Sequence, residues 1–228
     1  MPFHMIDYIF WCAQPVTMMV IAACMIRGRL HRDFPYFFNY VVFQIAAFGV
    51  EFPLRNWVNY FYLYWAITAL GIFVSFAALV EIVQKIAGQT KALRHRSIAL
   101  LCWCALGTMV AIAMWPFISS LDNVTNGIFV ADRTVRFMQF ALAFFLAMFG
   151  AGVGLSKRTL VFGIAMGFGL FAMVNLFVMT LLSHRSLLSK ATFSRISSTA
   201  YLLSTLIWLV YVAAAAKEDS SSRLTSAT

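Results

Sequence analysis

The residues of this chain that are best suited to chemistry are a few charged side chains beside long apolar runs. The clearest group lies in the segment GIFVADRTVRFMQF, residues 127–140, which places Asp132, Arg133 and Arg136 at the start of such a run. Charge beside or inside a membrane span is costly, so it usually has a partner or a function. These charges are therefore the first place to look for a binding or transport site.

Three acidic residues are each followed by a base four positions later, the favourable orientation for an ion pair on a helix. The pairs are Glu51 with Arg55, Glu81 with Lys85, and Asp132 with Arg136. Such pairs can serve as self-neutralised anchors at the membrane interface, with the long bases reaching water. Glu81 precedes its base by a full turn and so lies deeper, which also makes it a candidate proton or ion site.

Arg133 lacks a local acidic partner of this kind. It can extend toward lipid phosphates, as long basic side chains near span ends do. It can also turn inward toward Asp7 or Glu51 and connect three spans at their outer ends. Both interpretations stay open from the sequence.

Polar residues recur at helical spacing in several apolar segments. Lipid favours apolar surface, so these stripes should face the interior of a helix bundle. Their convergence predicts a polar pocket that opens outward and could bind a small molecule, although ordinary hydrogen bonds between helices need the same residue types. The candidate pocket residues are Asp7, Gln14, Gln44, Glu51, Asp132, Arg133, Arg136 and Gln139.

The composition shows what must position these residues. Of the 228 residues, 62% are apolar, 16% are aromatic and only 11% are charged, and the mean hydropathy is +0.85. These values lie far outside the range of a soluble domain. Because a span needs about 20 apolar residues, the chain has room for about seven helices and for no soluble catalytic domain.

The apolar runs predict an all-α membrane protein, a single bundle of seven transmembrane helices over residues 1–216. The first span is expected to be a retained anchor, because its basic residues follow the apolar run and do not precede it. The serine-rich tail, residues 217–228, is expected to be disordered and cytoplasmic. The predicted spans cover about residues 6–26, 34–54, 60–86, 97–118, 129–155, 159–182 and 197–216.

The orientation of the bundle follows from its basic residues, because short cytoplasmic loops collect Lys and Arg. With the amino terminus outside, eleven of the 17 Lys and Arg residues fall on the inner side and six on the outer side. The count predicts an outside amino terminus and a cytoplasmic carboxyl terminus. The net charge of +9 is then explained by topology and contact with anionic lipid, and its dispersal among loops speaks against nucleic-acid binding.

Missing motifs narrow the class of protein. The last span has no lysine for a retinal Schiff base, and the four histidines lie at span ends or in loops, which disfavours a haem held between mid-membrane histidines. No HExxH, GxSxG or paired deep aspartates are present. The sequence therefore predicts no enzyme, no catalytic residue, no metal site and no cofactor.

Three short motifs resemble those of uncharacterised seven-helix bacterial integral membrane proteins, a group without an assigned activity. They are LHRDFPYFFNY at residues 30–40, FYLYW at residues 61–65, and Glu81-Ile82 near the end of the third span. The resemblance covers mainly the first three spans. It implies a bacterial inner (cell) membrane and no particular mechanism.

Three functions are compatible with these patterns. The favoured one is a non-enzymatic sensor or receptor-like module that binds an unidentified small molecule in the outer pocket, with the lipid bilayer around it and a membrane or cytoplasmic protein as partner. The first alternative is a small transporter or channel, proton-coupled through Glu81, although the sequence shows no internal repeat of the kind many transporters have. The second is a structural subunit of a larger membrane complex.

Overall fold

The described chain is helical apart from short turns between helices. The computed structural model describes residues 5–54, 57–89, 122–149, 159–183 and 190–226, and these ranges contain no strand. Six helices are long and one is a single turn. They are α1 (Met5–Arg27), α2 (Leu30–Asp33), α3 (Pro35–Leu54), α4 (Tyr60–Gln89), α6 (Asp122–Phe149), α7 (Leu160–Ser183) and α8 (Lys190–Ser226).

Four of these helices contain stretches long and apolar enough to cross a membrane: Pro35–Leu54, Tyr60–Ile86, Leu160–Val178 and Arg195–Lys217. Large apolar side chains also remain exposed on the bundle surface, among them Phe73, Phe177 and Val210. An exposed apolar surface of this kind suits lipid and would be unfavourable in water. The structure therefore supports a membrane protein with transmembrane helices, as the composition predicted.

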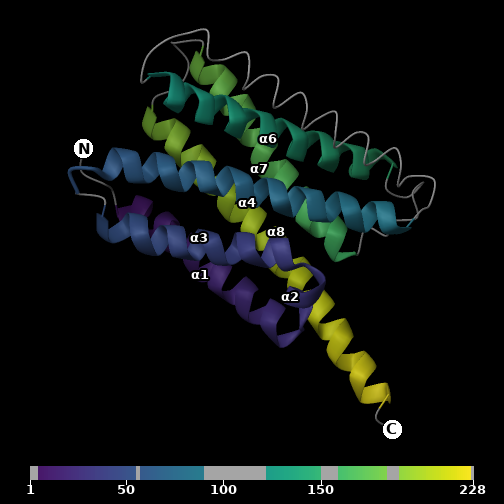
Figure 1. Cartoon of the computed structure of the whole chain (residues 1–228). Coiled ribbons are helices and arrows are strands. Elements are labelled where there is room, and N and C mark those ends of the chain that lie inside the picture. The colour runs from purple at the N-terminus through teal and green to yellow at the C-terminus, as the bar shows by residue number, and fades with distance from the viewer. Residues whose placement is uncertain (1–4, 55–56, 90–121, 150–158, 184–189, 227–228) are drawn as a thin grey trace.

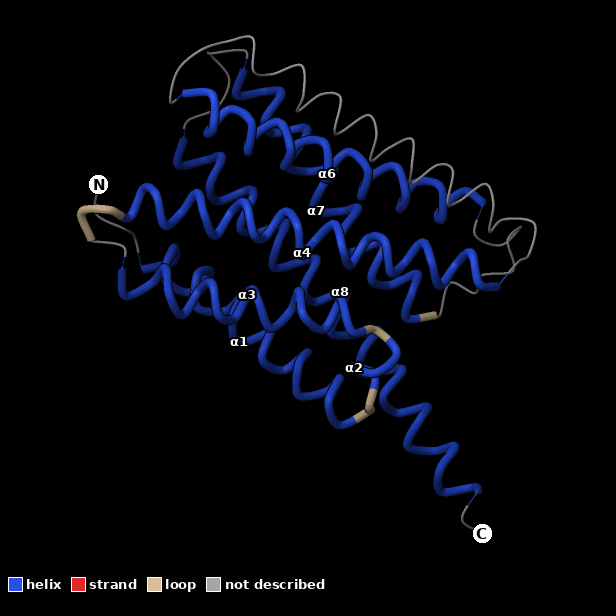
Figure 2. The backbone as a smooth tube through the Cα atoms, in the orientation of Figure 1, coloured by secondary structure: helices blue, strands red, loops and turns tan. Residues whose placement is uncertain are grey.

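The six long helices form a closed ring. Helix α1 packs against α3 and α8, α4 packs against α3 and α6, and α7 packs against α6 and α8. Figure 1 shows α4 between α3 on one side and α6 and α7 on the other, with the last turns of α8 extending beyond the bundle. The tube in Figure 2 shows the same arrangement, with short loops at the ends of the helices. A ring of helices leaves an interior that side chains must fill or line.

Glycines bring several helix pairs into close contact. A Cβ added to Gly163 or Gly167 of α7 would lie within 2.5 Å of the Tyr211 or Trp208 ring of α8. The close packing that this GxxxG pattern predicts is thus confirmed, with aromatic rings of α8 in the space of the missing side chains. Gly28 similarly allows Ala216 to approach, since an added Cβ would lie 2.8 Å from the Ala216 Cβ.

Large apolar side chains fill one half of the ring. This half holds the end of α1, the start of α3, the end of α4 and the start of α7, and its fully buried members include Met25, Phe37, Ile82 and Ile164. The hydrophobic cluster is continuous there, so this end of the bundle is closed.

Two boundaries differ from the sequence prediction. Helix α6 begins at Asp122, inside the segment expected to be a polar loop, because a helix can continue beyond the apolar stretch and an acidic residue suits its amino-terminal turn. Helix α8 runs from Lys190 to Ser226, so the tail expected to be disordered continues the last span as helix. Ala213 to Ala216 precede this tail, and alanine has the highest helix propensity.

The described residues do not reach every predicted span. The predicted fourth span, residues 97–118, lies outside them, as does the end of the predicted fifth span beyond Phe149. The remaining predicted spans coincide with α1, α3, α4, α6, α7 and α8, within a few residues at most ends.

Candidate functional site

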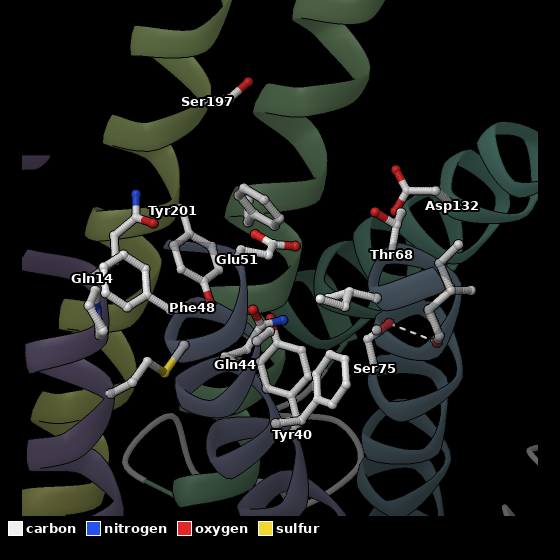
Figure 3. Close-up of a pocket in the computed structure, with 18 of the residues that line it drawn as sticks. Gln14, Tyr40, Gln44, Phe48, Glu51, Thr68, Ser75, Asp132, Ser197 and Tyr201 are labelled. Atoms are coloured by element: carbon white, nitrogen blue, oxygen red, sulfur yellow. Dashed lines mark hydrogen bonds between the residues drawn. The ribbon is translucent and has the colours of Figure 1, made fainter. Parts of the chain in front are cut away.

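A cavity of about 370 Å³ lies inside the ring, in the half that contains the turn between α3 and α4. All six long helices contribute to its wall. This volume is within the range of small-molecule sites. Figure 3 shows Gln44 and Glu51 of α3, Tyr201 of α8 and Gln14 of α1 around one space, with Asp132 and Ser197 at one end and Tyr40 at the other.

Six of the eight residues predicted from the polar stripes line this cavity. They are Gln14, Gln44, Glu51, Asp132, Arg136 and Gln139. They come from α1, α3 and α6, and each set recurs at helical spacing, so one face of each helix turns toward the common interior. The structure therefore brings these six residues together.

The other two predicted residues do not join them in the described structure. Arg133 has an exposed side chain and does not line the cavity. Successive residues on a helix point about 100° apart, so Arg133 cannot share the face that carries Asp132 and Arg136. Its exposed position agrees with the lipid-phosphate interpretation. Asp7 lies in α1, but its side chain is outside the described part of the chain.

The charged wall is built on α6. Arg136 Nε donates to Asp132 Oδ2 at 2.6 Å, and both side chains are largely buried. The ion pair predicted from the i,i+4 spacing is confirmed. The Arg136 guanidinium also lies 4.6 Å from the centroid of the Phe171 ring on α7, a cation–π contact.

Neutral polar groups hold other parts of the wall. Gln14 Nε2 donates to the backbone oxygen of Ser198 at 3.3 Å and so joins α1 to α8. Ser197 Oγ donates to Asn175 Oδ1 at 3.2 Å, between α8 and α7. These bonds fix the rotation of α8, which in turn directs Tyr201 toward the cavity.

The Tyr201 hydroxyl is buried and makes no hydrogen bond of good geometry in the described structure, although the Tyr40 side chain lies next to it. The Tyr201 hydroxyl oxygen is inaccessible to solvent, and the residue belongs to the cavity wall. Leaving a buried hydroxyl unpaired costs about 1–3 kcal/mol. A poorly paired group beside a cavity is a feature that a bound molecule could satisfy.

Tyr40 and Phe168 form the floor of the cavity, and Phe37 and Trp208 pack against them from behind. The ring centroids of Phe168 and Trp208 are 4.8 Å apart, and those of Tyr40 and Phe168 are 5.0 Å apart. Phe37 completes the group, 5.5 Å from Trp208, and Trp208 Nε1 donates to the Ile164 backbone oxygen at 3.0 Å. The floor is therefore rigid and apolar, and it separates the cavity from the filled half of the bundle.

The candidate residues omitted the aromatic side of the wall, although the polar stripes of the sequence include Tyr40 beside Gln44 and Tyr201 beside Ser197. They also omitted Tyr64, Thr68 and Ser75 of α4, which line the cavity as well. Thr68 and Ser75 are small residues of the kind found in packing seams, and Tyr64 belongs to the FYLYW motif. Their spacing of four and seven residues was the available signal, because it places them on one face of α4.

Glu81, the candidate proton or ion site, lies away from the cavity and has a defined partner. Its side chain is only 4% exposed. Oε1 accepts from the Tyr36 backbone N–H at 3.1 Å, and Oε2 accepts from that of Phe37 at 2.9 Å. These amides belong to the first turn of α3, where backbone N–H groups lack partners within the helix and the helix dipole favours negative charge. Glu81 thus caps α3 from the neighbouring α4.

The predicted ion pair between Glu81 and Lys85 does not form in the described structure. Lys85 Nζ lies instead over the Phe34 ring, 5.1 Å from its centroid, and the Glu81 carboxylate accepts from two backbone amides. Arg55, the predicted partner of Glu51, lies outside the described residues.

The wall offers few groups for metal binding or covalent chemistry. Among the described residues, no group of three or more His, Cys, Asp or Glu side chains could hold a metal ion. The cavity is instead suited to recognising a molecule through one carboxylate, amides, hydroxyls and aromatic faces. Comparison of the chain with protein-family models, curated proteins and solved structures gives no match.

Proposed function

We propose that the protein is a non-enzymatic seven-helix sensor or receptor-like module of a bacterial inner membrane, which binds a small molecule in its cavity from the outer side. The observation that carries this proposal is the cavity itself, which is lined by all six long described helices. A molecule bound there would contact every one of these helices. Its binding could therefore change their packing and be read out at the opposite end of the bundle.

The proposed orientation has the amino terminus outside and the carboxyl terminus in the cytoplasm. It is supported by the eleven-to-six distribution of basic residues and by the placement of the helix ends. The cavity joins the end of α3, the start of α4 and the start of α8. In this orientation that end of the bundle is the outer one, so the cavity faces outward.

The closed inner half favours a sensor over a transporter. A transporter must expose its site alternately to the two sides of the membrane. Here a continuous apolar cluster fills the half below the aromatic floor. Glu81 binds two backbone amides of α3, which gives this buried carboxylate a structural role without proton transfer.

A cavity-filling variant tests the proposal. Ala47 of α3 lines the cavity, whereas its neighbour Ala46 has an exposed side chain. Ala47→Phe should occupy ligand space, and Ala46→Phe should add an apolar ring toward lipid. We expect the wild type and Ala46→Phe, purified in lipid nanodiscs, to show ligand-dependent increases in melting temperature across a panel of metabolites, and Ala47→Phe to lose them.

Two results would contradict this function. One is an undiminished ligand-dependent shift in Ala47→Phe, which would place binding elsewhere. The other is a wild-type protein whose melting temperature does not respond to any member of a broad panel of metabolites and lipids. Ala46→Phe and Ala47→Phe should themselves melt within a few degrees of the wild type, because neither substitution breaks a hydrogen bond.

A further inference from the structure

The described wall of the cavity combines aromatic rings with more acidic than basic side chains. Of its 25 lining residues, eight are aromatic and three are charged. Aromatic faces carry partial negative charge and attract cations. The eight aromatic residues are Tyr40, Phe43, Phe48, Phe52, Tyr64, Phe168, Phe171 and Tyr201.

The three charged side chains do not contribute equally. Arg136 is already neutralised by Asp132 at 2.6 Å and lies over the Phe171 ring. Glu51 is half-buried and makes no hydrogen bond or ion pair with any residue in the described ranges. Because Asp132 and Arg136 pair with each other, Glu51 is the acidic side chain of the described wall that is not paired with a described base.

Several polar groups face the same space. Figure 3 shows Tyr201, Gln44 and Glu51 around it, and the buried Tyr201 hydroxyl makes no hydrogen bond of good geometry in the described structure. A ligand could therefore place a cationic group near Glu51 and a hydroxyl or carbonyl near Tyr201 and Gln44. Its apolar body would rest against the rings of the wall and floor.

We propose that the cavity binds an organic ammonium ion with an apolar or aromatic body. This inference rests on the proposed function and specifies its ligand class. An inorganic cation fits poorly, because about 370 Å³ is far more space than a metal ion needs and the described residues offer no cluster of metal ligands. An anion fits poorly because Arg136, the basic side chain of the described wall, is paired with Asp132.

Two probes of equal shape, one cationic and one neutral, measure the contribution of the ligand's positive charge to binding. (3-Hydroxyphenyl)trimethylammonium and 3-tert-butylphenol differ only in a quaternary nitrogen replaced by carbon. We expect the protein in lipid nanodiscs to bind the ammonium probe at least about tenfold more tightly, since the lost interaction is a partly buried charge contact. Affinity is measured by isothermal titration calorimetry, with empty nanodiscs as the blank for partitioning into lipid.

Two pairs of variants test which residues of the cavity wall cause the preference for the ammonium probe. Glu51→Gln should reduce the affinity for the ammonium probe at least about tenfold and leave that for 3-tert-butylphenol unchanged. Asp33→Asn removes the same charge from an exposed position at the end of α2, just before α3 begins, and should bind both probes as the wild type does. Phe48→Leu should weaken ammonium binding about two- to fivefold, whereas Phe144→Leu, at an exposed position on α6, should not.

The outcomes separate this inference from the proposed function. Equal affinity for the two probes, or full ammonium binding by Glu51→Gln, would overturn the organic-cation inference. If neither probe binds but the melting temperature still responds to another metabolite in a way that Ala47→Phe abolishes, the sensor stands and the ligand class is wrong. If neither probe nor metabolite has any effect, both proposals fail.

Discussion

At the scale of single residues, a substitution of Tyr201 can distinguish a structural role of its hydroxyl from a role in ligand binding. Because this hydroxyl is buried and makes no hydrogen bond of good geometry, Tyr201→Phe should not destabilise the empty protein, and removing a poorly paired hydroxyl can raise stability by up to about 1–3 kcal/mol. The same substitution should weaken a ligand that bonds to this oxygen. Melting temperature without ligand and affinity with the ammonium probe measure the two effects.

Tyr62 provides the matched control for this substitution. Its side chain is 65% exposed on α4, so Tyr62→Phe should change neither quantity. A marked fall in the melting temperature of Tyr201→Phe would show that the hydroxyl has a stabilising partner, and would remove one of the observations behind the ligand proposal.

Residue patterns predicted the charged side of the site better than its aromatic side. The Asp132–Arg136 pair and the common faces of Gln44 and Glu51 follow from helical spacing alone. Aromatic residues are frequent throughout this chain, so no local pattern distinguishes the rings that line the cavity from those that face lipid. Which rings line the cavity is determined only by the rotation of each helix in the bundle. Contacts such as the hydrogen bond between Gln14 and Ser198 set this rotation.

At the scale of elements, the start of α3 depends on a residue of α4. Glu81→Ala would remove the acceptor of the buried Phe37 N–H and of the partly buried Tyr36 N–H. At about 1–3 kcal/mol for each unpaired donor and roughly 2–4 °C for each kcal/mol, the melting temperature should fall by about 5 °C or more. Differential scanning fluorimetry of the purified variant checks this.

Gln84 lies three residues further along α4 with an exposed side chain, and Gln84→Ala should melt as the wild type does. Glu81→Gln keeps one accepting oxygen and should have an intermediate effect. If Glu81→Ala melted normally and instead abolished proton flux in vesicles, the capping role would be wrong and the transporter alternative would regain its basis.

The partner of Glu81 shows why some contacts cannot be found from sequence. Its spacing to Lys85 suggested an ion pair, but backbone amides carry no sequence signature as hydrogen-bond donors. Pro35 was the visible clue that a helix begins there, yet nothing in the chain told which side chain would reach that first turn. Helix positions were predictable from hydropathy because length and apolar content define them locally, whereas the polar ends of α6 and α8 were not.

At the scale of the whole molecule, the proposed topology can be tested without knowing the ligand. Glu81 lies beside the start of α3, so α4 ends at the filled end of the bundle, while Asp132 in the first half of α6 lies at the cavity end. The end of α4 and the start of α6 therefore lie at opposite ends of the bundle, and we propose that the predicted span at residues 97–118 makes the crossing between them. Together with the six described helices it would give an odd number of crossings.

Single cysteines and a membrane-impermeant maleimide test the crossing and the orientation in intact cells. With the amino terminus outside, cysteine at Asn59 or Asp122 should be labelled from outside, and cysteine at Gln89 or Lys217 should be labelled only after the cells are opened. The unsubstituted chain, with its own four cysteines, gives the background. Labelling of Gln89→Cys and Asp122→Cys from the same side would contradict a span between them. Complete reversal of all four positions would keep the seven spans but turn the cavity toward the cytoplasm, and the receptor proposal would then have to place its ligand inside the cell.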